Sequence, residues 1–241
     1  MTPEDLVAQT AAKINALGAK FYFDPASLAR GKEAGLDGFR LYILGRGGVL
    51  GDVSADVVSS AFGYFNPAVV ASIWDSAREI TTPMEAATLY LDCNADLGRE
   101  KLADTEGLAA FCDAAEQVIA DVAPAGLTLY TATARMPLPE DLPGRAMQLV
   151  VVHRELRGSL HLASIVAHGM DDAVAHALRR PDDVGTFGWA DGIEIPDGSQ
   201  PVLDQIDAAT DAITANAYRS LSDAQRQAFV DGVNAIDAAW A

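Results

Sequence analysis

The sequence predicts an all-α protein, and two observations lead to this class. Apolar residues recur at the three- and four-residue spacing of helices along most of the 241 residues. Helix-capping patterns, in which Ser or Thr is followed three residues later by Asp, Glu or Gln, begin segments at Thr2, Thr82 and Ser222. Residues 127–134 are the exception, because their Leu, Tyr and Thr content allows a short strand, although a helix is not excluded there. We therefore expect a multi-helix bundle of about nine to eleven helices.

The limits of the expected helices follow from proline, glycine and capping residues. Pro3 stands in a first turn, where proline is tolerated, and Gly18 ends that helix. Three prolines make residues 137–143 a stiff connector, and residues 187–201, rich in Gly and Asp, are typical of a loop. The expected helices span residues 2–17, 25–32, 38–46, 54–65, 67–74, 82–97, 104–122, 144–170, 171–178, 201–217 and 222–240.

Two parts of the chain, residues 1–125 and 144–241, flank this connector. Gly45-Arg46 in the first and Arg157-Gly158-Ser159 in the second occur in comparable apolar contexts, each after a capped helix and a turn with Pro. This pattern predicts two topologically similar helical halves. Chance similarity between helical segments explains it as well, and the two halves can equally form one compact domain.

The charge balance disfavours several kinds of partner. The chain has 34 acidic and 17 basic side chains, which give a formal net charge of −17. The charge disfavours nucleic acid as a partner, because binding phosphates requires cationic side chains, and it disfavours an anionic membrane surface for the same reason. The N-terminus shows no signal-peptide pattern, and no segment approaches the ~18 apolar residues of a membrane span. Cys93 and Cys112 lie in apolar contexts, so we expect buried free thiols in a cytoplasmic protein.

A cationic stripe follows the longest expected helix, residues 144–170. Apolar residues cover most of that helix, which predicts a central position in the bundle. Arg157, His161, Ser164 and His168 repeat at spacings of four, three and four, so they form one line that contains no acid. This line can be a solvated face with local ion pairs, or a buried structural pair such as Arg157 with Asp52. It can also be a pocket wall, where Arg binds a carboxylate or phosphate and His161 acts as the acid or base of a reaction.

An aromatic cluster near the glycine-rich segment 45–48 supplies a second wall for such a pocket. Its rings surround Arg46 in sequence and suit a flat anionic ligand, although core packing is the default role of aromatic residues. The stripe histidines are too far apart to share one metal ion, and no zinc, haem or phosphate-loop motif is present, so we expect neither a metal nor another cofactor. The candidate ligand-binding residues are Tyr42, Arg46, Phe65, Arg157, His161, Ser164 and His168.

Five short segments resemble an actinobacterial family of helix-turn-helix, MarR-like proteins. They are Gly45-Arg46 with Leu50-Gly51, Phe65-Asn66-Pro67, residues 154–161, Gly188-Trp189 and Ala209-Thr210-Asp211. The resemblance implies an all-α fold with a degenerate winged-helix part towards the C-terminus, and it places Arg46, Arg157, Gly158 and His161 on the family's motifs. MarR-like proteins commonly dimerise through terminal helices, which implies a homodimer here.

Two departures from the family pattern affect its implications. Ser159 stands where the family usually has an acidic residue, and the acidic residues 190–198 replace the expected recognition helix. DNA-binding residues therefore do not carry over. We expect a small-molecule-binding protein with a pocket for an aromatic or carboxylate-bearing ligand. The alternatives are an enzyme of secondary metabolism that uses His161 as general acid or base, and a ligand-responsive transcriptional regulator.

Overall fold

The computed structural model describes residues 1–240, which form twelve α-helices, one short 3-10 helix and no strand. This confirms the predicted all-α class. The helices are α1 (Pro3–Leu17), α2 (Pro25–Glu33), α3 (Gly38–Gly48), α4 (Ala55–Phe62), α5 (Pro67–Arg78), α6 (Pro83–Lys101), α7 (Leu108–Asp121), α8 (Thr128–Ala134), α9 (Leu142–Ala167), α10 (Asp172–Arg179), α11 (Ser199–Ala217) and α12 (Asp223–Ala238), with the 3-10 helix at Pro181–Asp183.

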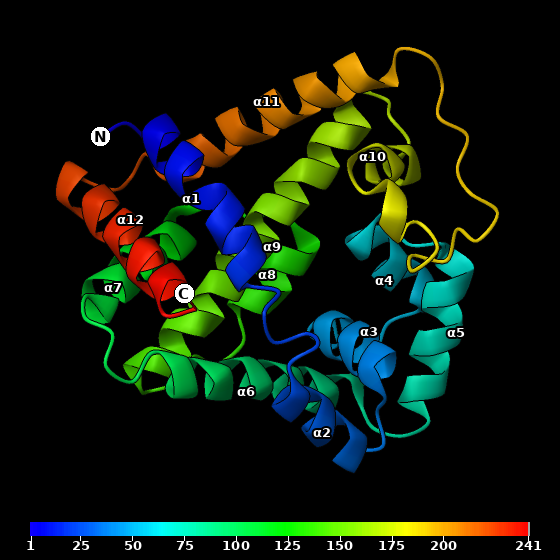
Figure 1. The fold of residues 1–241 in the computed structure, drawn as a ribbon, viewed down its shortest axis with the longest axis horizontal. Coiled ribbons are helices and arrows are strands. Elements are labelled where there is room, and N and C mark those ends of the chain that lie inside the picture. Colours follow the sequence, from blue (N-terminus) through cyan, green and yellow to red (C-terminus); the bar gives the residue numbers. More distant parts are fainter. Residues whose placement is uncertain (241) are drawn as a thin grey trace.

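Helix α9 crosses the middle of the molecule, as its all-round apolar sequence predicts (Figure 1). Helices α1, α7, α11 and α12 pack on one side of it and bury a core that includes Met147 and Leu156 of α9. Helices α3 to α6 form a second core on the other side, to which α9 contributes Val151. The central helix therefore presents side chains to both cores.

Local signals explain most of the helix ends. Thr2, Thr82 and Ser222 each form the reciprocal capping box that the sequence predicts. The segment that allowed a short strand is helix α8. Two of its three threonines bond within the helix, because the hydroxyls of Thr131 and Thr133 donate to the carbonyl oxygens four residues earlier, at 2.8 and 2.9 Å.

Small residues allow α3 to lie unusually close to α6. A Cβ atom added to Gly48 would stand 2.0 Å from the carbonyl oxygen of Pro83, and one added to Gly45 would stand 2.6 Å from the Cβ of Tyr90. The helix continues through Gly48, two residues beyond its expected end. The glycines therefore serve close helix packing.

The packing does not follow the order of the chain. Helix α1 contacts α11 and α12, so the first core joins residues from both predicted halves, whose similarity to each other stays a prediction.

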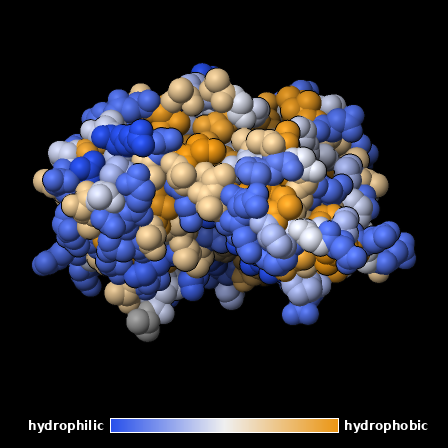
Figure 2. All heavy atoms as spheres, turned by 90° about the horizontal axis from the view of Figure 1, so that it is seen from above, coloured by the Kyte–Doolittle hydropathy of each residue, from blue (hydrophilic) through white to orange (hydrophobic). Residues whose placement is uncertain are grey.

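Cys93 and Cys112 are buried free thiols, as expected. On the face shown in Figure 2, hydrophilic side chains predominate and small apolar areas lie between them. Within residues 1–240, no helix has the length and apolar character needed to cross a membrane.

Candidate functional site

Two arginines and one glutamate form a buried ion cluster between α3 and α9. Arg46 donates from Nε to Glu155 Oε1 at 2.9 Å and from Nη2 to Oε2 at 2.8 Å. Arg154 donates from Nη1 to the same Oε1 at 3.2 Å. The Glu155 side chain is only 3% exposed. One carboxylate thus accepts three charge-assisted hydrogen bonds from two guanidinium groups.

The surroundings of Arg46 occupy all of its donor nitrogens. Its Nη1 donates to the Tyr42 hydroxyl at 3.2 Å, and its guanidinium lies 4.4 Å from the centroid of the Phe62 ring. Burial alone would raise the pKa of Glu155, but the charges and hydrogen bonds of Arg46 and Arg154 hold that pKa below its ordinary value. A ligand anion at Arg46 would therefore have to displace Glu155 or Tyr42.

The stripe residue Arg157 faces α11. Its Nη2 donates to Asp211 Oδ1 at 2.8 Å. The pairing of Arg157 with Asp52 was a wrong prediction, because Asp52 lies beside α5 and pairs there with Arg78. Local ion pairing, one of the three interpretations of the stripe, is therefore what the structure shows for Arg157.

His161 is held in one orientation by α11. The Thr210 hydroxyl donates to the Ile206 carbonyl at 2.7 Å, so its oxygen accepts from Nδ1–H of His161 at 2.9 Å. Burial, together with the nearby charge of Arg179, lowers the pKa of His161 to about 4. The imidazole is thus neutral near pH 7, with the lone pair on Nε2.

The other predicted site residues lie in two further places. Tyr42 and Phe65 are neighbours beside the ion cluster, with ring centroids 6.1 Å apart. Ser164 donates to the Leu160 carbonyl at 3.0 Å, and His168 donates from Nδ1 to the Ser164 carbonyl at 2.8 Å, so both are bonded within α9. The structure thus brings Arg46, Tyr42 and Phe65 together, whereas Arg157 and His161 bond to residues of α11. A role for any of them in ligand binding stays a prediction.

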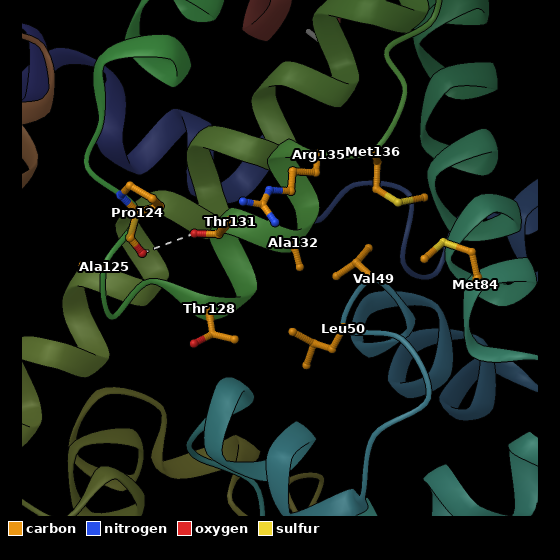
Figure 3. Close-up of a pocket in the computed structure, with 10 residues that line it drawn as sticks. All are labelled: Val49, Leu50, Met84, Pro124, Ala125, Thr128, Thr131, Ala132, Arg135 and Met136. Carbon is orange, nitrogen blue, oxygen red and sulfur yellow. Dashed lines mark hydrogen bonds between the residues drawn. The ribbon is translucent and has the colours of Figure 1, made fainter.

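A groove that the sequence did not reveal lies between α3, α6 and α8 (Figure 3). Its volume is about 660 Å³, within the range of small-molecule sites. Val49 and Leu50 form one wall, the residues of α8 face them, and the thioethers of Met84 and Met136 lie at one end (Figure 3). The residues that line this α8 groove are Val49, Leu50, Met84, Pro124, Ala125, Thr128, Thr131, Ala132, Arg135 and Met136.

Arg135 is the one charged residue in the groove lining. Among residues 1–240, eleven of the thirteen arginines have a carboxylate within 4.0 Å, and the exceptions are Arg135 and Arg219. Both of these side chains are exposed. Arg135 thus places an unpaired guanidinium beside an apolar groove, in a chain with twice as many acids as bases. No sequence signal marked it, because the surrounding residues are neutral.

Comparison with known proteins supplies the family. The model of a helix-turn-helix family matches residues 7–189, about three quarters of the chain. The chain belongs to this helix-turn-helix family. Comparison with curated proteins and with solved structures gives no match. The finer resemblance to MarR-like actinobacterial proteins stays a prediction.

Helices α4 and α5 have the layout of a helix-turn-helix unit, because the short turn Gly63–Asn66 joins them. In DNA-binding units of this kind, the N-terminal residues of the second helix contact the bases. In this helix-turn-helix protein, residues 187–189 form a strap across that end of α5. Asn66 donates its backbone N–H to the Phe187 carbonyl at 2.9 Å, and the rings of Phe65 and Phe187 stack at 4.1 Å.

The strap also holds an unusual backbone conformation in the turn. Tyr64 has a φ angle of 63°, which is uncommon for a residue with a side chain. Trp189 Nε1 donates to the Tyr64 carbonyl at 2.7 Å, and the Tyr64 N–H donates to Asp172. Residues 190–198 after the strap contain no helix, in agreement with the predicted loss of a recognition helix there.

Proposed function

We propose that this helix-turn-helix protein binds a small aliphatic carboxylate in the α8 groove. The observation that supports this most directly is the unpaired Arg135 guanidinium beside an apolar surface. A carboxylate would pair with Arg135, while an aliphatic chain would cover Val49, Leu50 and the two methionines.

The composition of the groove favours an aliphatic over an aromatic ligand. None of its ten lining residues is aromatic, so a flat ring would find no partner for stacking. Met84 and Met136 have flexible thioether side chains, which adapt to chains of different shape. The proposal thus keeps the carboxylate of the predicted ligand. It drops the predicted aromatic wall, because those rings lie around Arg46 and do not line the groove.

An enzymatic role for His161 has less support in the geometry. His161 is not part of the groove lining, and its Nδ1–H is engaged by Thr210. The low pKa of about 4 also makes it a weak base near pH 7.

A role as a DNA-binding regulator has the support of the family name and is opposed by the charges. The only basic residue of α5 is Arg78, which pairs with Asp52 and Asp75. Residues 181–240 carry eleven carboxylates and only two arginines. The scaffold therefore offers few free cations for a phosphate backbone.

Calorimetric titration with decanoate, below its critical micelle concentration, tests the ligand proposal. We expect saturable binding by the wild-type protein and about tenfold weaker binding by Arg135→Gln, from the loss of a charge-assisted pair worth about 1.4 kcal/mol. Arg219→Gln removes the other unpaired arginine and is the matched control, with unchanged affinity. Decanol, which has the same chain without the charge, should bind the wild type and Arg135→Gln equally.

Three outcomes would contradict this proposal. They are no saturable binding of decanoate or its longer homologues, an equal loss of affinity in Arg219→Gln, and full affinity in Arg135→Gln.

For the regulator, fluorescence anisotropy with random-sequence duplex DNA is the test. We expect no binding at low salt by the wild type or by Trp189→Ala, which frees the start of α5. Salt-dependent, saturable binding of DNA would instead support a regulator.

A further inference from the structure

A second, much smaller space lies behind the wall of the α8 groove. It is a small cavity of about 10 Å³, enough for one water molecule. Its lining includes Arg46 and Glu155 of the ion cluster, Leu91 of α6 and Val151 of α9. Val49 is the one residue that lines both the groove and this cavity. Val49 therefore stands at the boundary between the groove and the cavity.

The backbone that carries Val49 is fixed. Val49 caps the C-terminus of α3 and donates its N–H to the Gly47 carbonyl. The preceding Gly48 touches the backbone of Pro83, so α3 cannot move closer to α6. The branched side chain of valine is itself stiff at χ1. The residue at the boundary of the two spaces is thus carried by closely packed backbone.

The far side of the cavity is partly apolar. Leu91 and Val151 face it, while the donors of Arg46 are already paired with Glu155 and Tyr42. An alkyl chain that passed Val49 would therefore contact Leu91 and Val151, and would lie beside Arg46 and Glu155, whose charges are already paired with each other.

We infer that Val49 is a specificity-determining residue that limits how far an aliphatic ligand enters the protein. This inference rests on the proposed ligand class. It differs from the role of Arg135, because Val49 selects the length of the apolar chain and Arg135 selects its charge.

Titration with octanoate, decanoate, dodecanoate and tetradecanoate tests this inference. For the wild type, each methylene buried in the groove should raise affinity about fourfold, until the groove is full and affinity stops rising. In Val49→Ala that limit should move to a longer chain by about one or two methylenes, a gain of about four- to fifteenfold for the longest ligand. Val49→Ile should move the limit to a shorter chain.

Leu50→Ala is the matched control, because Leu50 lines the groove without bordering the cavity. It should weaken binding of every ligand and leave the limiting length unchanged. The same limit in the wild type, Val49→Ala and Val49→Ile would overturn the Val49 inference and leave the ligand proposal standing. Failure of the wild type to bind any of the four carboxylates would instead overturn the ligand proposal, and the Val49 inference with it.

Discussion

Replacement of Glu155 by glutamine should strongly destabilise the protein. The carboxylate is 3% exposed and accepts hydrogen bonds from Arg46 and Arg154. In Glu155→Gln the amide oxygen can keep one or two of these bonds, but two guanidiniums, whose side chains are only 12% and 19% exposed, lose their only carboxylate. Breaking a buried ion pair by removing one partner costs about 3–5 kcal/mol. For a chain of this length, that corresponds to a fall in Tm of roughly 10 °C.

Urea unfolding monitored by circular dichroism measures this cost, and Asp211→Asn is the matched control. Asp211 pairs with Arg157, but its side chain is 52% exposed, so its loss should cost less than about 1 kcal/mol. A cost below about 1 kcal/mol for Glu155→Gln as well would refute the interpretation of the cluster as a tightly coupled buried unit.

Acid provides a second check on Glu155. The folded protein lowers the pKa of this carboxyl below its ordinary value of 4.5. Its stabilising contribution is therefore present above pH 4.5 and is lost as the pH falls through the lower folded pKa. The difference in unfolding free energy between wild type and Glu155→Gln should accordingly narrow in acid. A difference that stays constant would contradict this linkage.

Two further predictions concern glycines and a histidine. Gly48→Ala should cost about 3 kcal/mol or more in urea unfolding, because its Cβ would meet the Pro83 backbone at 2.0 Å. Gly158→Ala is the control, because an added Cβ would have Glu155 Oε2 as its nearest neighbour, at 3.9 Å. It should instead stabilise the protein by about 0.5–1 kcal/mol. Equal effects of the two substitutions would contradict the close packing of α3. Burial lowers the pKa of His153 from 6.5 to about 4. The contribution of the neutral imidazole to the free energy of unfolding is therefore fully present above pH 6.5 and is lost as the pH falls towards 4. Between about pH 7 and 5 the wild type should therefore lose about 2 kcal/mol that His153→Gln does not lose, and parallel pH profiles would refute this.

The sequence predicted the features that depend on neighbouring residues. Capping boxes such as the one at Thr82 are complete within four residues, and the all-round apolar surface of α9 is visible in one segment. Helix α8 was ambiguous because threonine favours strands. In the folded chain α8 is helical, its Leu129 and Tyr130 are buried, and the hydroxyls of Thr131 and Thr133 bond to the preceding turn.

The sequence could not predict contacts between distant segments. Arg46 was expected to face a ligand, yet its partner Glu155 lies 109 residues further along and outside the stripe. The α8 groove was missed for a related reason. Its wall comes from the end of α3, the start of α6 and the segment around α8, and only Arg135 among its residues carries a charge. No periodicity within one segment can reveal such a surface.

The five segments that carry the family resemblance meet in three contacts. Arg46 of the first binds Glu155 of the third, and Asn66 of the second bonds to the strap that contains the fourth. Arg157 of the third pairs with Asp211 of the fifth. The segments thus fix α9 against α3 and α11, and the strap against α5. Their positions indicate a structural role.

Under the proposed ligand function, selectivity could vary while the scaffold stays the same. Met84, Arg135 and Met136 of the groove lie outside all five segments, and none of them takes part in the ion cluster or the strap. Most arginines of this acidic chain pair with its own carboxylates, which leaves Arg135 as the cation that a ligand in the groove can reach. We expect Arg135→Gln to keep the unfolding free energy of the wild type to within about 0.5 kcal/mol, because the side chain is exposed and unpaired. A large loss of stability would show that Arg135 supports the fold, and would remove the main reason for assigning it to a ligand.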